Sequence, residues 1–170
     1  MAPATTRSAA GTARPGSRPL RFYLAAAVIT VLDQVTKVLM VRQLALGASV
    51  PFLGPVASLT LTHNRGSAMG LLPGGGQFLA VVAALVIIAI AVLGPRYARA
   101  NRLAWWGLCL LLGGALGNLL DRARLGYVVD FIDFHFWPVF NVADIAVVCG
   151  AILMVIALVG RREATAPSEV

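Results

Sequence analysis

The sequence is poor in charged residues, and acidic residues are the scarcest of them. Only 12% of its 170 residues are charged, and just seven are Asp or Glu. A soluble domain of this length carries about twice that charged fraction. Hydrophobic residues make up 59% of the chain, and the mean hydropathy is +0.83. This composition excludes an ordinary soluble domain and indicates an integral membrane protein.

Residues for metal binding or nucleophilic catalysis are also scarce. Cys109 and Cys149 lie inside apolar runs, and we expect both to be buried, because free Cys behaves as a small hydrophobe. His63 and His135 have no Cys nearby at the spacing of a zinc site. Ser67 has no neighbouring base in the sequence. We therefore expect no metal, no cofactor and no Ser or Cys nucleophile.

Four apolar runs are long enough to cross a membrane as helices, at about residues 20–40, 76–93, 103–120 and 139–160. Each is close to the roughly 20 residues that a helix needs to cross about 30 Å of hydrocarbon. The sequence therefore predicts an all-α membrane protein with one four-helix domain over residues 20–160. Residues 1–19 are expected to form a disordered cytoplasmic tail, and residues 161–170 a second cytoplasmic tail.

The net charge of +7 is distributed as in a membrane protein rather than a nucleic-acid-binding protein. Nine arginines lie before the first run, between the second and third, or after the fourth: Arg7, Arg14, Arg18, Arg21, Arg96, Arg99, Arg102, Arg161 and Arg162. The positive-inside rule then places both termini in the cytoplasm. Residues 42–75 and about 122–138 should face outward, and no nucleic-acid partner is expected.

The two outer segments carry their own structural signals. Apolar and polar residues alternate from Ala57 to His63, which is typical of a half-exposed strand. The second segment, Gly126 to Asp133, is apolar for an exposed loop. We expect a small extracytoplasmic β-element from the first segment. The second should form an interfacial loop or short helix at the membrane surface.

Five aspartates lie within or beside the apolar runs: Asp33, Asp121, Asp130, Asp133 and Asp144. Ionisable side chains are costly in a membrane and usually mark a functional site. Asp33 and Lys37, four residues apart on the first helix, can form an ion pair. Gly113 and Gly117 have the spacing that lets two helices approach closely.

Two motifs with one spacing place carboxylates at the outer surface. Asn118-x-x-Asp121 ends the third run and Asn141-x-x-Asp144 opens the fourth, so we expect them to share one local geometry. The third helix should run outward and the fourth inward, with Asp130 in the loop between them. Three carboxylates, two asparagines and Arg122 can therefore converge on one site.

Spacing alone leaves structural roles open for all these residues. The Asp33–Lys37 pair could lock two helices together, and the glycines could serve packing only. Asp121 could anchor a helix end, and Asp130 and Asp144 could be separately hydrogen-bonded. A catalytic role would use two nearby carboxylates in a low dielectric, which share their protons because they do not both ionise easily. The ionised group can activate water while the protonated one polarises a peptide carbonyl.

Five motifs, in this order, resemble those of bacterial lipoprotein signal peptidase (signal peptidase II). They are Asp33-Gln34-x-x-Lys37, the segment His63 to Ala68, the segment Gly113 to Arg122, Val128-Val129-Asp130-Phe131, and Phe140 to Asp144. The resemblance covers about residues 20–160. It implies an aspartyl endopeptidase of the bacterial cytoplasmic (inner) membrane that cuts diacylglyceryl-modified prolipoproteins before the lipidated Cys. The implied partners are this substrate and membrane lipid, and a monomer is expected.

The resemblance also implies roles for individual residues. Asp130 and Asp144 correspond to the catalytic pair. Residues that bind substrate or support the pair are Asp33, Lys37, Asn64, Gly66, Asn118, Asp121, Arg122 and Asn141. Ser67 and Met69 stand where the family usually has Ala and an aromatic residue, and the segment between the two catalytic aspartates is short. These departures concern the shape of the substrate groove and outer flap.

Two other classes of protein compete with a peptidase. A proton or cation pathway would also use intramembrane Asp and Lys, but it predicts acids spread through the depth of the membrane. Here Asp121, Asp130 and Asp144 are expected at one face, which favours hydrolysis. A scaffold without chemistry would leave this cluster of carboxylates unexplained.

Overall fold

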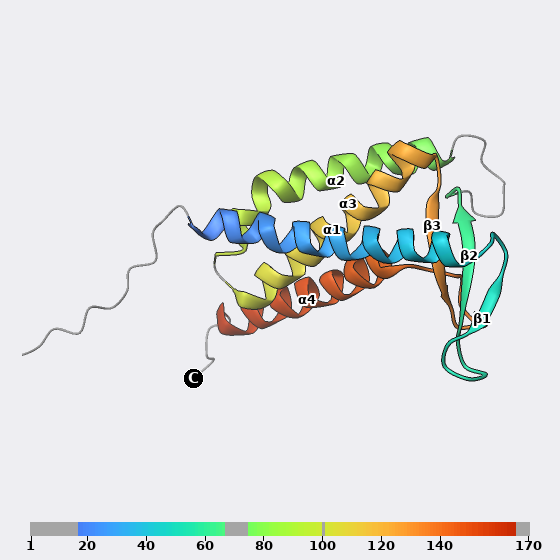
Figure 1. Cartoon of the computed structure of the whole chain (residues 1–170). Helices are drawn as coiled ribbons and strands as arrows, with labels where there is room; N and C mark the ends of the chain where they lie inside the picture. The colour runs from blue at the N-terminus through green and yellow to red at the C-terminus, as the bar shows by residue number, and fades with distance from the viewer. Residues whose placement is uncertain (1–16, 67–74, 100, 166–170) are drawn as a thin grey trace, which may run out of the picture.

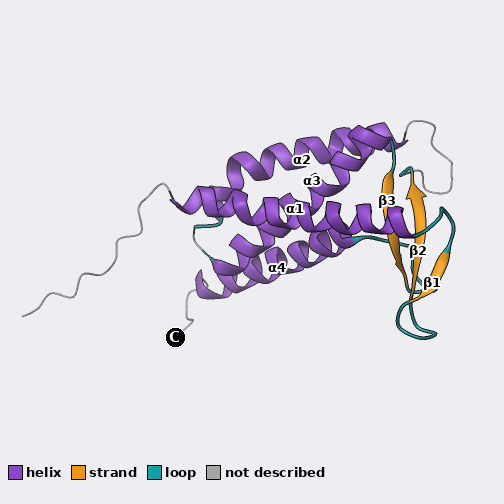
Figure 2. Ribbon diagram, in the orientation of Figure 1, coloured by secondary structure: helices purple, strands orange, loops and turns teal. Residues whose placement is uncertain are grey.

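A bundle of four long helices carries a three-stranded sheet at one end (Figure 1). The computed structural model describes residues 17–66, 75–99 and 101–165. Its elements are, in order, α1 (Ser17–Gln43), β1 (Ser49–Pro51), β2 (Ser58–Asn64), α2 (Gly75–Tyr97), α3 (Arg102–Leu125), β3 (Val128–Asp133) and α4 (Val142–Thr165). Figure 2 shows that all the strands lie beyond the same end of the bundle. The predicted combination of four membrane helices and a small β-element is confirmed.

All four helices are long and apolar enough to span a membrane. They extend beyond the apolar runs through polar flanking residues, except that α4 begins at Val142, after the expected start at residue 139, because Asn141 caps it there. α1 begins at Ser17, inside the segment expected to be a tail, and α4 continues to Thr165. α3 continues to Leu125 and ends at Gly126, whose φ of 77° suits a glycine C-cap. The expected tails otherwise lie outside the described residues.

α3 is the central helix of the bundle. In its most apolar stretch 44% of the residues are buried, against 11% in α2. Large apolar side chains of the other three helices are widely exposed, as expected for surfaces that face lipid. The spans are therefore arranged around α3, and the functional residues of α3 lie in the interior.

Glycines allow α1 and α4 to approach α3 closely. A Cβ atom at Gly113 would lie 2.6 Å from the Ala26 carbonyl oxygen of α1, and one at Gly114 would lie 2.5 Å from the Ala143 oxygen of α4. The Thr30 hydroxyl, which lies on α1, donates to the Gly113 carbonyl at 2.9 Å. The expected role of this glycine stripe in helix packing is confirmed.

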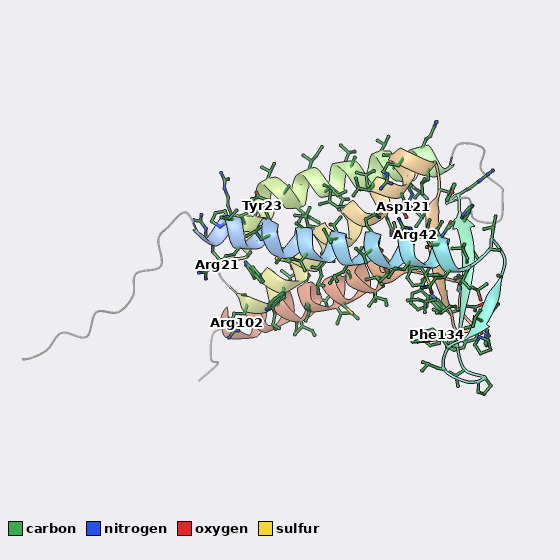
Figure 3. The ribbon with its side chains drawn as sticks, in the orientation of Figure 1. Arg21, Tyr23, Arg42, Arg102, Asp121 and Phe134 are labelled. Carbon is green, nitrogen blue, oxygen red and sulfur yellow. The ribbon has the colours of Figure 1, made fainter. Side chains whose placement is uncertain are left out.

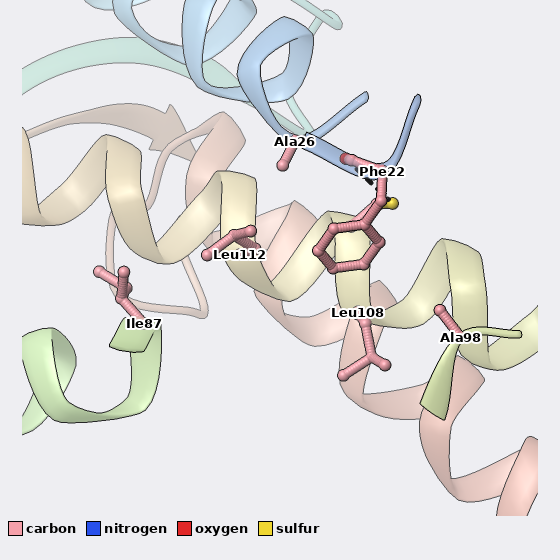
Figure 4. Close-up of a cluster of buried hydrophobic side chains, with 7 residues drawn as sticks. Phe22, Ala26, Ile87, Ala98, Leu108 and Leu112 are labelled. Carbon is pink, nitrogen blue, oxygen red and sulfur yellow. Dashed lines mark hydrogen bonds between the residues drawn. The ribbon is translucent and has the colours of Figure 1, made fainter. Parts of the chain in front are cut away.

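A hydrophobic cluster joins α1, α2 and α3 (Figure 4). Phe22, Leu108 and Leu112 form its centre, and Cys109 is fully buried beside them, with its thiol 3.6 Å from the Phe22 carbonyl oxygen. The prediction of a buried thiol is therefore confirmed for Cys109. It is wrong for Cys149, which is exposed on α4 because the apolar run there has a surface that packs on no other helix.

The sheet is antiparallel with strand order β1-β2-β3. β2 confirms the strand expected from the alternation between Ala57 and His63. The second outer segment differs from expectation, because it forms strand β3 rather than an interfacial loop or short helix. Its β-branched residues suit a strand. Val128, Val129 and Asp130 are buried between β2 and the bundle.

The closeness of α1 and α3 gives a test of the packing. Gly113→Ala should destabilise the protein by about 1–3 kcal/mol, the usual cost of overpacking a tight interior. The matched control is Gly160→Ala in α4, where an added Cβ would meet no atom within 4 Å. That change should be neutral or stabilising by about 0.5–1 kcal/mol, because Ala favours a helix over Gly. Melting temperatures of the purified variants in a neutral detergent would check this. A Gly113→Ala protein as stable as Gly160→Ala would contradict the packing.

Candidate functional site

Polar side chains from four elements meet where the sheet joins the helix bundle. Six are buried: Asp33, Lys37, Asn118, Asp121, Asp130 and Asn141. Figure 3 shows Asp121 at this end of the bundle, far from Arg21 and Arg102 at the other end. In an apolar interior such groups must satisfy one another. Their hydrogen bonds therefore define the site.

Lys37 is the only cation in this buried set, and its ammonium group is fully used. The Nζ atom lies 2.9 Å from Asp33 Oδ2 and 2.8 Å from Asp121 Oδ2, and it donates to Asn118 Oδ1 at 2.9 Å. An ammonium group has three N–H donors, so each finds one acceptor. The predicted Asp33–Lys37 ion pair is confirmed, and Asp121 is a second anion on the same cation.

Asp33 connects α1 to the first turn of α4. Its Oδ1 atom accepts the backbone N–H of Ala143 at 2.9 Å, a donor that has no partner within its own helix. Gly117 makes room for the carboxylate, because a Cβ there would clash with Asp33 Oδ2. The side chain therefore holds three helices together as well as pairing with Lys37.

Asp121 connects α3 to β3. Its Oδ2 atom accepts the backbone N–H of Val129 at 3.1 Å, in addition to the bond from Lys37. Its Oδ1 atom accepts from Gln34 Nε2 at 2.9 Å. This carboxylate thus fixes the strand residue immediately before Asp130.

Asn141 and Asp144 cap the start of α4. Asn141 Oδ1 accepts from the Asp144 backbone N–H at 3.0 Å, while Asp144 Oδ2 accepts from the Asn141 backbone N–H at 3.1 Å. This reciprocal pair has the logic of a capping box. Asp144 Oδ1 also accepts from Asn118 Nδ2 at 2.8 Å. The Asp144 carboxylate is therefore oriented by α3 and by its own helix end, and its side chain is half-buried.

Asp130 lies on β3 and is only 1% exposed. Asn64 Nδ2 donates to its Oδ2 atom at 2.9 Å, and Asn141 Nδ2 donates to its Oδ1 atom at 2.7 Å. The pKa of Asp130 is raised to about 6, mainly by burial and also by the nearby Asp144 charge, although the Asn64 and Asn141 hydrogen bonds and the Lys37 charge act in the opposite direction. Asp130 therefore holds a proton at a higher pH than an ordinary aspartate does.

Two asparagines link the carboxylates into one network. Asn141 Nδ2 lies within hydrogen-bonding distance of Asp130 Oδ1 and, at 3.0 Å, of Asn118 Oδ1. Asn118 Oδ1 also accepts from Lys37, and its amide nitrogen donates to Asp144. A continuous path of polar contacts thus runs from the Lys37 cluster to both Asp130 and Asp144.

Other predicted site residues lie at the edge of this network. Asn64 Oδ1 accepts from the Gly66 backbone N–H at 2.9 Å, and the φ of 70° at Gly66 suits glycine. Arg122 does not converge on the carboxylates within the described residues. Its Nη1 atom is 3.4 Å from the Asn118 carbonyl oxygen, and its buried Nε atom has no partner there. Ser67 and Met69 lie outside the described residues.

The two Asn-x-x-Asp motifs do not share one geometry, contrary to expectation. Asn141 and Asp144 bond to each other's backbone across a helix start, where free N–H groups exist. Asn118 and Asp121 lie inside α3, where the backbone is already paired, so both side chains turn to Lys37. The same spacing therefore produces a cap in one place and a cation site in the other.

Gln34 belongs to the first motif but was not among the expected site residues. Its Nε2 atom lies near Asp33, Asp121 and the Gly117 carbonyl oxygen, and its Oε1 atom accepts from Arg124 at 3.3 Å. A polar residue between Asp33 and Lys37 in an apolar helix was the available signal. The backbone donors of Val129 and Ala143 left no signal in the sequence.

Asp133 is excluded from the network although it is on the same strand as Asp130. It accepts the His135 backbone N–H at 2.8 Å and the Thr60 hydroxyl at 2.9 Å. The His135 backbone bond, followed by the Thr60 bond, lowers the pKa of this solvent-accessible carboxylate. Asp133 is therefore a local loop and sheet contact.

The fold and the site define a multi-pass membrane protein with a carboxylate site at one end of its bundle. The family model described as "Signal peptidase (SPase) II" matches residues 25–160. Lipoprotein signal peptidase of Halothermothrix orenii is 40% identical over 136 residues, covering 80% of this chain and 93% of that protein. The Mycobacterium leprae lipoprotein signal peptidase is 44% identical over 164 residues, covering 86% of this chain and 80% of that protein.

Solved structures agree with the sequence relatives. Two of them, both described as a bacterial membrane enzyme determined by the in meso method, match with TM-scores of 0.78 and 0.75. The first is 32% identical, and the match covers 88% of this chain and 94% of that one. The second is 34% identical, and the match covers 81% of this chain and 92% of that one. The chain belongs to the signal peptidase II family and is a bacterial membrane peptidase.

The charge arrangement around Lys37 predicts an order of stabilities. Lys37→Met leaves two buried carboxylates without a cation and should cost about 3–5 kcal/mol. Asp121→Asn leaves the Lys37–Asp33 pair balanced and should cost less. Thr36→Ala is the control, since Thr36 bonds only the nearby Asp33 carbonyl oxygen, and it should change stability by less than about 0.5 kcal/mol.

Melting temperatures and turnover per folded enzyme would separate support from chemistry. Equal stability of Lys37→Met and Thr36→Ala would contradict the role of Lys37. An Asp121→Asn protein with full stability and no turnover would move Asp121 into the catalytic pair.

Proposed function

We propose that this peptidase is an aspartyl endopeptidase whose catalytic pair is Asp130 and Asp144. The observation that carries this assignment is how the four inner carboxylates are partnered. Asp33 and Asp121 share the Lys37 ammonium group, whereas Asp130 and Asp144 accept only from amide N–H groups within the described residues. An amide donor favours the ionised carboxylate less strongly than a contacting ammonium group does, so the pair that lacks an ammonium contact is the better candidate for proton sharing.

The pair can perform hydrolysis with water alone. One carboxylate is protonated and the other ionised, as the raised pKa of Asp130 favours, and the shared proton belongs to the pair. The ionised group takes a proton from water as the water oxygen attacks the peptide carbonyl carbon. The protonated group donates to the carbonyl oxygen. As the resulting gem-diol collapses and the C–N bond breaks, the ionised carboxylate takes a proton from a gem-diol hydroxyl and the protonated one passes its proton to the departing amine.

We propose that the substrate is a diacylglyceryl-modified prolipoprotein, cut before its lipidated Cys. The names of the relatives support a lipoprotein substrate. The site lies where the sheet meets the spans, so a signal helix could lie in the bilayer while its cleavage point reaches Asp130 and Asp144. Asn64 and Gly66 at the end of β2, together with Arg122, are the proposed contacts for the peptide.

The carboxylates form one cluster rather than a path along the bundle. Asp33, which is nearest the middle of its helix, is joined to Asp121 through Lys37 and to α4 through Ala143. This arrangement supports hydrolysis over a proton or cation pathway, which needs acids spread through the membrane depth.

We further propose that the site faces the outside of the cytoplasmic membrane and that both termini face the cytoplasm. α1 begins and α4 ends at the end of the bundle opposite the sheet (Figure 1). Among the described residues, seven of the twelve Lys and Arg residues lie at that end, against four exposed or half-buried arginines and the buried Lys37 at the sheet end. The positive-inside rule then places the sheet outside.

The catalytic pair is tested by removing one ionisable oxygen at a time. Asp130→Asn and Asp144→Asn should each lower turnover of a lipidated prolipoprotein by about a thousandfold or more, because the two groups act as a unit. The control is Asp133→Asn, three residues along the same strand, which should keep near-parent turnover. All three proteins should retain the parent melting behaviour in detergent. Near-normal turnover by either of the first two variants would rule out the assignment.

The orientation is tested by thiol labelling in intact cells. In a Cys149→Ala background, Cys at exposed Leu53 or Ala123 should react with an impermeant maleimide. Cys at exposed Arg96, at the other end of the bundle, should react only after the cells are permeabilised. The reverse labelling pattern would place the site in the cytoplasm.

A further inference from the structure

A cavity of about 500 Å³ lies at the opposite end of the bundle from the carboxylate site. It is open on one side and is lined by residues from the start of α1, the end of α2 and the start of α3. Phe22 and Ala98 form part of its buried wall (Figure 4), and Trp105 and Trp106 line the α3 side. Its volume is within the range of small-molecule sites, roughly 300–1,000 Å³. None of its lining residues belongs to the proposed catalytic machinery.

Three arginines from separate segments line this cavity: Arg21 of α1, Arg99 after α2, and Arg102 at the start of α3. None of the lining residues is acidic. Within the described part of the chain, ion pairs are made by Lys37 alone. The positive ends of the α1 and α3 dipoles point toward the same region, and the negative end of the α2 dipole partly offsets them. The charge of the cavity therefore suits an anion with several oxygen atoms, such as a phosphate group.

The aromatic side of the cavity favours an anion that carries acyl chains. Trp105 and Trp106 meet edge to face, with ring centroids 4.6 Å apart, and Trp106 is 48% exposed. Tyr97 and Leu103 are close in sequence to the residues that line the cavity, and both side chains are exposed. They add aromatic and apolar surface to this end of the bundle. Tryptophan and arginine together are typical of the level at which lipid headgroups meet hydrocarbon. A free phosphate ion would use only the arginines.

We propose that this cavity is a binding site for an anionic phospholipid. The phosphate contacts Arg21, Arg99 and Arg102, while the acyl chains lie against Trp106 and the exposed surface of α3. We expect the ligand to be phosphatidylglycerol, because its single negative charge is at the phosphodiester group. The site does not depend on the proposed peptidase mechanism, because it lies at the other end of the bundle.

Arg96 separates this proposal from a general attraction between basic residues and an anionic membrane. It is exposed and lies in the same region of the chain as Arg99, but it does not line the cavity. Diffuse attraction would depend on Arg96 as much as on Arg99 or Arg102. A built site would depend on the lining arginines only.

The two cavity tryptophans allow a direct measurement. The chain has three Trp residues, and Trp137 lies beside the sheet, so Trp137→Phe leaves fluorescence from the cavity pair alone. This protein would be placed in nanodiscs that contain phosphatidylcholine. Either brominated phosphatidylglycerol or brominated phosphatidylcholine, each with the bromine on its acyl chains, would then be added in the same amount to separate samples. The quenching of tryptophan fluorescence by the two lipids would be compared.

Brominated phosphatidylglycerol should quench this fluorescence at lower mole fraction than brominated phosphatidylcholine. Arg99→Gln/Arg102→Gln should weaken the preference by about tenfold for each arginine, the effect of losing one hydrogen bond to a charged group. Arg96→Gln should leave it unchanged. Parent-like cleavage of a lipidated prolipoprotein by each variant would show that the fold is intact, and Arg21→Gln provides a second lining variant.

Three results would overturn the proposal. Equal quenching by the two lipids would show no headgroup selection. An equal loss of preference in Arg96→Gln would show diffuse attraction. Relief of quenching by inorganic phosphate, but not by sodium chloride of the same ionic strength, would show that the cavity binds a soluble anion instead.

Discussion

A buried ammonium group organises the interior of this protein. Lys37 is 3% exposed and contacts two carboxylates and one amide oxygen from two helices. An isolated charge at this depth would be strongly unfavourable, so the cation and its two anions stabilise the fold only as a set. Because Asp33 also binds the start of α4 and Asp121 binds β3, this set determines how α1, α3, α4 and the sheet are placed.

The same network explains how a membrane protein can hold the two proposed catalytic carboxylates in place. Asp121 holds the Val129 backbone, which fixes Asp130 one residue later, and Asn118 holds Asp144 while bonding to Lys37. Asn141 contacts Asp130 and caps the helix that carries Asp144. The proposed pair is thus oriented entirely by neutral donors, and the cation is one step removed. Direct contact with Lys37 would favour the ionised form and oppose proton sharing.

Much of the fold was predictable from the sequence, because its signals are local. Long apolar runs predicted the four helices, and the alternation of apolar and polar residues predicted β2. The spacing of Asp33 and Lys37 predicted their ion pair. The strand β3 was not predictable in this way. Val128 to Asp133 does not alternate between apolar and polar residues, because each face carries one aspartate among apolar residues, and its pairing with β2 depends on residues some seventy positions away. Periodicity within a short buried segment does not distinguish a strand from an interfacial loop.

The site was predictable in its membership but not in its division of roles. Charge in an apolar run identified Asp33, Asp121, Asp130 and Asp144, yet equal spacing suggested that Asn118–Asp121 and Asn141–Asp144 were equivalent. Their difference arises from backbone context. A helix start offers free N–H groups, which orient Asp144 without a cation, whereas the helix interior offers none, so Asp121 turns to Lys37. The position of each motif along its helix, rather than its spacing, therefore decides whether its carboxylate caps a helix start or contacts the buried ammonium group.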